Sequence, residues 1–294
     1  MRRGVPSLGL LLVSFLWGTT FVAVKSALTD VTPLAFVGLR FGLAALLSWL
    51  LVRRRPGLRV ALGWGIPLGL VLGTAYSAQT IGLVDTTPSR SAFITGAGVV
   101  AIPLWGVLLL GRRPGFFPLV GLALAVFGVW LITDPAGGNW KAGDSWTLAC
   151  SILFSLHVVL LTRYGAHEVY GLLASQLLVT AVLTGTGSRL LESSPRVHWS
   201  GSFLGVLALT GILVSFLTTL LQLRLQPLVS PGRTAVIFAT EPVFAALFSA
   251  IFVGERLGLR GWIGGGLVLA GVLFSELGGK AFRPAEPHAP ESPL

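Results

Sequence analysis

The sequence predicts an all-α integral membrane protein with ten transmembrane helices in two inverted five-helix repeats. Of its 294 residues, 53% are hydrophobic and 11% are charged, whereas soluble domains carry roughly 25% charged residues. The mean hydropathy is +0.83. The apolar residues form long runs joined by short loops and do not alternate over about ten residues, which favours membrane helices over an outer-membrane barrel.

Ten apolar runs are long enough to cross a bilayer, which takes about 20 residues per helix. In order, the predicted spans are residues 7–28, 33–52, 60–83, 88–110, 115–133, 145–163, 169–187, 201–223, 232–253 and 261–279. The first run resembles a signal peptide, but it continues through Val24 without a small-residue cleavage site, so we expect it to be retained. Residues 280–294 are rich in proline and polar residues and predict a disordered cytoplasmic tail.

The distribution of basic residues predicts the orientation. The net charge is +10, and the positive-inside rule explains it without a nucleic-acid partner, because the basic residues cluster between apolar runs. With the N-terminus in the cytoplasm, thirteen basic residues lie on that side: Arg2, Arg3, Arg53, Arg54, Arg55, Arg59, Arg112, Arg113, Arg163, Arg224, Arg233, Lys280 and Arg283. Five lie opposite: Lys141, Arg189, Arg196, Arg256 and Arg260. We therefore expect a multi-pass plasma (inner) membrane protein with both termini cytoplasmic.

A shift of 143 residues superimposes the second half of the chain on the first. Its matches include Pro88 with Pro231, Arg90 with Arg233, Gly111 with Gly254, Gly121 with Gly264 and Gly128 with Gly271. Each copy holds five spans, an odd number, so the second copy enters the membrane upside down. We expect the copies to be residues 1–134 and 135–279, with a binding site near the midplane where they meet and rocking between two access states.

Four stretches resemble the EamA family of the drug/metabolite transporter superfamily. They are FLWGTTFVAVK from Phe15, LRFGLAALL from Leu39, SAFITGAGVVAIPLWGVLLLG from Ser91 and TEPVFAALFSAIFVGE from Thr240. The resemblance covers nearly the whole chain except the tail. It implies two EamA-type repeats around a central cavity and the export of amino acids, other metabolites or drugs.

The sequence departs from the family pattern at one acidic position. The family often has Gly-Glu after the fourth span, as Gly254-Glu255 stands after the ninth, but here the first copy reads Gly111-Arg112. We therefore expect no chemistry from the acidic loop residue.

Glu241 lies about halfway along the ninth span. An isolated charge in lipid is costly and marks a functional-site hypothesis. On one interpretation Glu241 borders the cavity and binds a cation or a proton, which would couple transport to protons. On the other it caps a helix break before Pro242 or forms an interhelical hydrogen bond. Its counterpart in the first repeat is Gly98, so the feature is asymmetric.

Other charged residues lie within or at the ends of the spans. Arg40 lies well inside the second span, and a pair with Glu241 is the economical hypothesis. Arg40 then either holds a substrate carboxylate or forms a structural ion pair. Lys25 is expected to snorkel to the interface. Arg90 and Arg233 begin the fourth and ninth spans, where interfacial anchoring is favoured over flanking the cavity mouths.

Polar and aromatic residues at similar depths are the candidates for a substrate cavity, which we expect spans 1, 3, 4, 6, 8 and 9 to line. The candidates are Trp17, Thr20, Arg40, Tyr76, Gln79, Thr80, Phe93, Thr95, Trp105, Ser155, Thr218, Gln222, Phe238 and Glu241. Tyr76, Gln79 and Thr80 lie about one turn apart, so one face can present all three. His157 lacks companions for a metal site and is expected to be a buried neutral histidine.

The glycines of the fifth and tenth spans are expected to pack against the fourth and ninth spans, with a homodimer interface as the alternative to a monomer. The sequence has no Walker loop, HExxH motif or Gly-x-Ser-x-Gly turn, and predicts neither an enzyme nor a cofactor.

The predicted function is secondary transport of a small metabolite, amino acid or drug-like molecule, coupled to protons or running downhill. The expected partners are this small molecule and the lipid bilayer. An intramembrane enzyme acting on a lipid and a passive channel are the alternatives.

Overall fold

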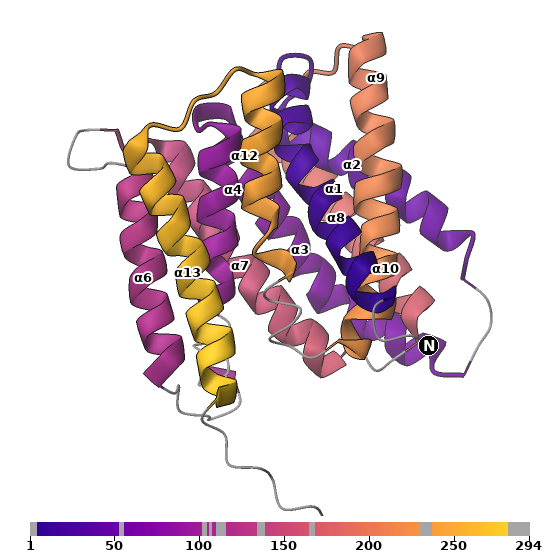
Figure 1. The fold of residues 1–294 in the computed structure, drawn as a ribbon. Coiled ribbons are helices and arrows are strands. Elements are labelled where there is room, and N and C mark those ends of the chain that lie inside the picture. The colour runs from indigo at the N-terminus through magenta and orange to yellow at the C-terminus, as the bar shows by residue number, and fades with distance from the viewer. Residues whose placement is uncertain are drawn as a thin grey trace, which may run out of the picture.

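The residues described in the computed structural model form helices joined by short links (Figure 1). The backbone is described for residues 5–52, 56–101, 105, 108–109, 116–133, 139–164, 168–229 and 237–281. The side chains of residues 99, 118, 133, 162–164 and 275–281 are not described. The predicted tail and several predicted cytoplasmic arginines, among them Arg233, lie outside the described residues.

The first half of the chain contributes α1 (Val5–Ala27), α2 (Pro33–Trp49), α3 (Leu58–Asp85), α4 (Pro88–Ala97), the 3-10 turn η1 (Gly98–Ala101) and α6 (Phe116–Thr133). Both α2 and α4 begin with proline, whose missing N–H is tolerated in the first turn of a helix. Thr87 caps α4, because its hydroxyl oxygen accepts the N–H of Arg90 at 3.4 Å.

The second half contributes α7 (Ala142–Tyr164), α8 (Val169–Leu191), α9 (Gly201–Ala208), the π-helical η3 (Leu209–Leu217), α10 (Thr218–Leu225), the 3-10 turn η4 (Gln226–Leu228), α12 (Glu241–Phe252) and α13 (Leu259–Ala281). The elements from α9 to η4 run on as a single helix of 28 residues. Glu168 caps α8, because its carboxylate accepts the N–H groups of Tyr170 and Gly171 at 3.2 and 2.7 Å.

Five helices within the described residues are long and apolar enough to cross a membrane: Val5–Ala27, Leu58–Asp85, Ala142–Leu161, Val169–Leu191 and Gly201–Leu228. Shorter apolar helices cover Pro33–Trp49, Leu119–Ile132, Glu241–Phe252 and Leu259–Phe274. Large apolar side chains face outward, as at Phe116 and Trp262, which are 70% and 64% exposed. This apolar exterior suits lipid, and the structure is that of a multi-pass membrane protein.

Three of the predicted spans are not continuous α-helices, and the eighth is one of them because it contains the π-helical η3. The helix from Pro88 ends at Ala97 and becomes a 3-10 turn, next to two glycines that weaken an α-helix. In the ninth span a turn at residues 239–240 precedes α12, and Pro242 removes a backbone hydrogen bond at this point. The sequence did not predict the break after Ala97, whereas a helix break before Pro242 was one of the two interpretations of Glu241. Residues 102–104, 106–107, 110 and 232–236 of the fourth and ninth spans lie outside the described residues.

Helices α6 and α13 lie side by side at one edge of the bundle (Figure 1). A Cβ atom built on Gly271 would stand 2.5 Å from the carbonyl oxygen of Gly121. Gly128 and Gly264 approach each other in the same way. The predicted packing on the fourth span is confirmed for Gly265, whose added Cβ atom would stand 2.8 Å from the Phe93 ring, but Gly128, Gly264 and Gly271 instead pack the fifth and tenth spans on each other.

The remaining helices surround the centre of the molecule. Helix α3 packs against α7 and α8, α2 packs against α8, and α1 packs against α12 and α10. Val37, Leu68, Leu172 and Leu177 are completely buried in the largest apolar cluster. The start of α1 and the end of α13 lie at the same end of the bundle, the lower end in Figure 1. We call this the N-terminal end.

Polar links join the helices at the opposite end. The Lys25 ammonium donates to the carbonyl oxygens of Leu83 and Val84, each at 2.7 Å, where α3 ends. Lys25, which the sequence predicts to snorkel to the interface, therefore has a structural role there, because its ammonium caps the end of α3. Arg90 Nη2 pairs with Asp144 Oδ2 at 2.5 Å and joins α4 to α7.

Glu255 completes this set, which we call the opposite-end network. Its carboxylate accepts hydrogen bonds from the hydroxyl groups of Thr87 and Ser249 and from the N–H of Ser89, the last at 3.3 Å. It thereby ties the loop after α12 to the start of α4. The network consists of three interactions: Lys25 of α1 with the end of α3, Arg90 with Asp144, and Glu255 with the start of α4.

Candidate functional site

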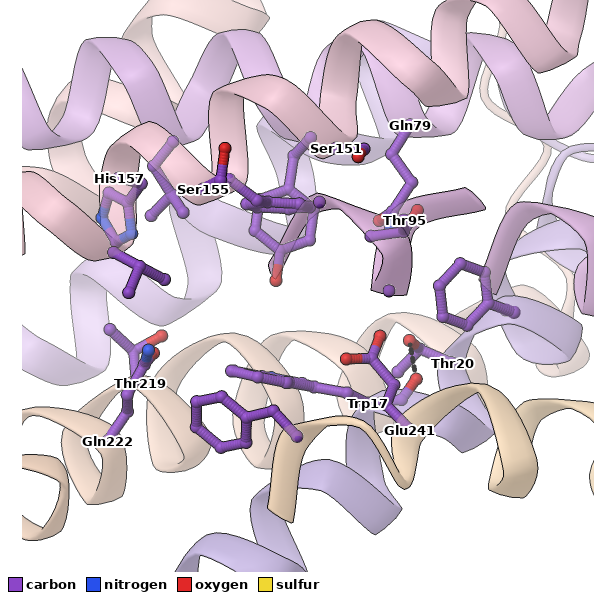
Figure 2. Close-up of a pocket in the computed structure, with 18 residues that line it drawn as sticks. Trp17, Thr20, Gln79, Thr95, Ser151, Ser155, His157, Thr219, Gln222 and Glu241 are labelled. Carbon is purple, nitrogen blue, oxygen red and sulfur yellow. Dashed lines mark hydrogen bonds between the residues drawn. The ribbon is translucent and has the colours of Figure 1, made fainter. Parts of the chain in front are cut away.

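A cavity of about 110 Å³ lies within the bundle (Figure 2). Its lining residues come from α1, α3, α4 with η1, α7, α10, and α12 with the turn before it. These elements belong to spans 1, 3, 4, 6, 8 and 9, the six that the sequence predicts to line the cavity. Figure 2 shows two facing walls. One carries Gln79, Thr95, Ser151, Ser155 and His157, and the other carries Trp17, Thr20, Thr219, Gln222 and Glu241.

Nine of the predicted cavity residues line this space: Trp17, Thr20, Tyr76, Gln79, Thr95, Ser155, Gln222, Phe238 and Glu241. Polar and aromatic side chains from both halves of the chain are therefore brought together around one cavity. Thr80, which shares a helical turn with Tyr76, is buried and does not line the cavity. The face of α3 that lines the cavity is thus narrower than the sequence predicts, because it includes Tyr76 and Gln79 but not Thr80.

Three more candidates lie behind the lining. Thr218 is fully buried, and its hydroxyl oxygen accepts the indole N–H of Trp17 at 3.0 Å. The indole N–H of Trp105 donates to Ser155 Oγ at 2.9 Å. Phe93 packs in an apolar cluster with residues of α6, α12 and α13. Two of these side chains therefore position cavity residues, and Phe93 contributes to the core.

Arg40 is almost fully buried, with 2% of its surface exposed, and stands behind Tyr76. Its Nε donates to Ser215 Oγ at 2.6 Å, and the guanidinium carbon lies 4.9 Å and 5.4 Å from the ring centroids of Tyr76 and Phe41. Its Nη2 has no hydrogen-bond partner among the described residues. The predicted ion pair with Glu241 was wrong for this structure, because the guanidinium contacts aromatic rings instead.

Glu241 occupies the first turn of α12 and projects into the cavity (Figure 2). The positive end of the helix dipole favours a carboxylate at this position. Helix α1 approaches closely at Gly18, where a Cβ atom would stand 3.0 Å from the carbonyl oxygen of Glu241. The close crossing of α1 and α12 therefore fixes the backbone that carries the carboxylate.

Two aromatic rings line the cavity together with Glu241, and one of them, Trp17, lies on the same wall in Figure 2. The centroids of the Trp17 and Phe238 rings lie 5.0 Å apart. On another part of the lining, Tyr76 and Phe154 meet edge to face with centroids 4.9 Å apart. The cavity therefore combines apolar ring faces with hydroxyl and amide groups, a pattern typical of small-molecule sites.

Sequence reasoning missed several lining residues: Phe21, Leu72, Gly96, Gly98, Ser151, Phe154, Val158 and Thr219. His157 was expected to be buried, and it is 4% exposed with Nε2 3.2 Å from Gln176 Oε1, yet its ring also lines the cavity. Thr219 stands next to Thr218, which was chosen instead. The π-helical turns of η3 precede both residues and change the helical phase, a shift that hydropathy does not reveal.

Comparisons with known proteins agree with this architecture. The model of the EamA-like transporter family matches residues 5–134 and again residues 141–277. A solved crystal structure with 20% sequence identity covers 96% of this chain and 100% of its own, with a TM-score of 0.66. That likeness shows a shared fold.

Relatives extend over nearly the whole chain. A protein of Archaeoglobus fulgidus named as an uncharacterized transporter is 29% identical over 94% of this chain and 87% of its own. The uncharacterized inner membrane transporter YedA of Escherichia coli is 26% identical over 97% and 95%. A probable amino-acid metabolite efflux pump of Escherichia coli is 25% identical over 91% and 93%. With the two matches of the family model, the chain belongs to the EamA-like transporter family.

Proposed function

We propose that this membrane transporter is a secondary transporter that moves a small organic solute by alternating access. The observation that carries the proposal is the cavity, which six helices from both halves of the chain surround in the middle of the bundle. Its volume of about 110 Å³ is small beside the roughly 300–1,000 Å³ of drug-sized ligand pockets. In this conformation the cavity therefore favours a metabolite or an amino acid over a drug-like molecule.

Helix contacts support two inverted repeats, proposed as residues 1–134 and 135–279. Under such a repeat α2 corresponds to α8, α4 to α12, and α6 to α13, and each of these pairs is in contact. Equivalent contacts also recur, since α1 packs on α12 as α7 packs on α4. A two-fold axis through the centre requires this pattern. The two matches of the family model point the same way.

The two ends of the bundle differ in a way that suits alternating access. The opposite-end network ties α1 to α3, and α4 to α7 and to the loop after α12, at one end. His157 and Gln222 extend the cavity lining into the halves of α7 and α10 that run toward the N-terminal end. We infer a state whose access leads to the N-terminal end, which the charge distribution assigns to the cytoplasm.

Export is the proposed direction, by analogy with the relative named as a probable efflux pump. Glu241 is the proposed site of proton coupling, because the described lining holds no other carboxylate. Downhill facilitation without coupling is the alternative. The transporter names of the relatives favour this function over a lipid enzyme.

Reconstitution into liposomes tests the proposal. Vesicles loaded with one unlabelled amino acid or metabolite at a time should accumulate the labelled form transiently, and an excess of unlabelled solute outside should saturate this counterflow. Liposomes without protein are the control. Flux without saturation or counterflow would indicate a channel, and chemical conversion of the solute would indicate an enzyme. Failure of every solute to move would overturn the proposal.

A further inference from the structure

Glu241 carries the one carboxyl group on the described cavity lining, and this group lacks a partner. Within the part of the chain that the structure describes, it forms neither a hydrogen bond nor an ion pair, while its backbone is held by the crossing of α1 and α12. A carboxylate in apolar surroundings without a counter-charge is unfavourable, because it has left water without compensation. The group is thus positioned for a ligand that supplies positive charge and hydrogen-bond donors.

The hydroxyl groups of Thr20 and Thr240 and the indole N–H of Trp17 are already engaged with other acceptors. The Thr20 hydroxyl donates to the carbonyl oxygen of Trp17 at 2.6 Å, and the Thr240 hydroxyl donates to that of Ile237 at 2.6 Å. The indole N–H of Trp17 donates to Thr218 Oγ1 at 3.0 Å. What this wall presents beside Glu241 is therefore the face of an indole ring and not its N–H group.

The ring faces of Trp17 and Phe238 attract cations as well as apolar groups. An ammonium within about 6 Å of an aromatic centroid is attracted by the negative face of the ring, most strongly at tryptophan. A carboxylate beside two aromatic rings therefore selects for positive charge through two independent effects. The same rings provide an apolar surface for the uncharged part of a solute.

Positive charge from the protein does not compete at this wall. Neither lysine nor arginine is present among the described lining residues. Arg40 is buried, with 2% of its surface exposed. Its guanidinium carbon lies 4.9 Å from the centroid of the Tyr76 ring. Arg40 is thus separated from the cavity by an aromatic ring, whereas Glu241 projects into it.

We propose that the transported solute carries a protonated amine, which binds to the Glu241 carboxylate while its apolar body packs on Trp17 and Phe238. The inference rests on the proposed transport function and narrows its substrate class. An alcohol of the same shape gains the ring contacts but not the ion pair. A carboxylate of the same shape meets Glu241 as a like charge.

Three probes of matched shape test this inference: 2-phenylethylamine, 2-phenylethanol and 3-phenylpropionate. Each carries one phenyl ring on a short chain, and they differ in charge. Binding is measured with the full chain in lipid nanodiscs, using labelled 2-phenylethylamine and competition by the other two. We expect the amine to bind about tenfold more tightly than the alcohol, or better, which corresponds to about 1.4 kcal/mol. Equal or tighter binding of the alcohol or the carboxylate would overturn the inference.

Glu241→Gln is the informative variant, because it keeps the shape of the side chain and removes its charge. It should lower the affinity for the amine to that for the alcohol and leave the affinity for the alcohol unchanged. Asp85→Asn is the matched control, since it removes an exposed carboxylate at the end of α3 and should leave the preference intact. An unchanged preference in Glu241→Gln contradicts the proposal. If that variant does not fold, the three probes on the natural protein still decide.

The counterflow experiment separates the two levels of inference. If a neutral or anionic solute shows saturable counterflow while amines are neither bound nor moved, the protein is a transporter and the amine inference is wrong. If no solute of any charge shows counterflow, the proposed transport function is wrong, and the amine inference is overturned with it. Saturable counterflow of amine solutes that compete with 2-phenylethylamine supports both.

Discussion

Gly128 and Gly264 are in backbone contact where α6 crosses α13. A Cβ atom on Gly128 would stand 2.6 Å from the carbonyl oxygen of Gly264, and a Cβ atom on Gly264 would stand 2.6 Å from that of Gly128. Such distances are shorter than any relaxed contact between these atoms. The two helices therefore depend on glycine at both positions for their separation.

Gly128→Ala should push α6 away from α13 and lower the stability of the protein. Overpacking of a close contact costs about 1–3 kcal/mol. The thermal unfolding midpoint of the detergent-solubilised protein measures the effect. Gly266→Ala is the control, because it adds the same methyl group to α13 at a position with nothing within 4 Å. Equal midpoints for the two variants would contradict the packing described for this pair of helices.

Arg40→Met should leave the thermal stability unchanged or raise it. The guanidinium is buried without a carboxylate partner among the described residues, and its Nη2 makes no hydrogen bond there. Replacing buried ionic groups by apolar side chains of similar volume is often neutral or stabilising by about 1–4 kcal/mol. The unfolding midpoint of the variant is the measurement. A large loss of stability would mean that Arg40 is held by favourable interactions beyond Ser215 and the two rings.

Glu255→Ala should open the bundle at the opposite end. The substitution removes the acceptor for two hydroxyl groups and the N–H of Ser89. Hydrogen bonds to a charged group are worth about 1.5–3 kcal/mol each, and about 1.4 kcal/mol shifts an equilibrium tenfold. A cysteine introduced as Gln79→Cys in a Cys150→Ala background should then react about tenfold faster with a membrane-impermeant maleimide added from this end.

Asp85→Asn provides the comparison for this labelling experiment, because it removes a carboxylate at the same end that accepts none of the hydrogen bonds described for the network and acts on Lys25 only through its charge. Its labelling rate should equal that of the parent. If Glu255→Ala also leaves the rate unchanged, Glu255 does not help to close this end.

Acid should weaken the link between the α1–α2 turn and the start of α9. A hydrogen bond from Ser200, 2.5 Å long, is the main reason why the pKa of Asp30 is lowered, with smaller contributions from His198 and Arg196. Because the folded pKa is depressed, Asp30 stabilises the fold above its ordinary pKa of about 3.9. That contribution is lost as the pH falls through the lowered value.

Unfolding midpoints at pH 6 and pH 3 measure this effect. Asp30→Asn should be less stable than the natural protein at pH 6 and should lose less stability between the two pH values. The same acid-induced loss in both proteins would exclude Asp30 as a contributor.

The helices could be predicted from the sequence because lipid leaves a spanning backbone few alternatives. The predicted span 169–187, for example, lies within α8, which runs from Val169 to Leu191. The break next to Gly98 was missed because it lies inside an apolar run, whereas Pro242 made a break at Glu241 one of two interpretations. Hydropathy measures the transfer of side chains into lipid and carries no information on where a helix is interrupted.

The sequence could predict how deep in the spans the cavity residues lie, but not which side of each helix faces the cavity. Glu241 and Trp17 stand out because a charge or an indole N–H inside lipid requires a protein environment. Arg40 satisfies the same criterion at a similar depth, yet it points to Ser215 and not to Glu241. The rotation of each helix about its axis decides such cases, and contacts between distant segments determine that rotation.

The π-helical turns of η3 connect α9, which is held at its start, to α10, which lines the cavity. Ser200 holds the start of α9 through the N–H of Phe203 at 3.0 Å, whereas Thr219 and Gln222 of α10 line the cavity. Each π turn contains one residue more than an α turn, because its hydrogen bonds run from i to i+5. Conversion of η3 to α geometry would therefore rotate α10 about its own axis and shift it along that axis, while α9 stayed in place. Two polar groups would then leave the cavity wall without any helix tilting.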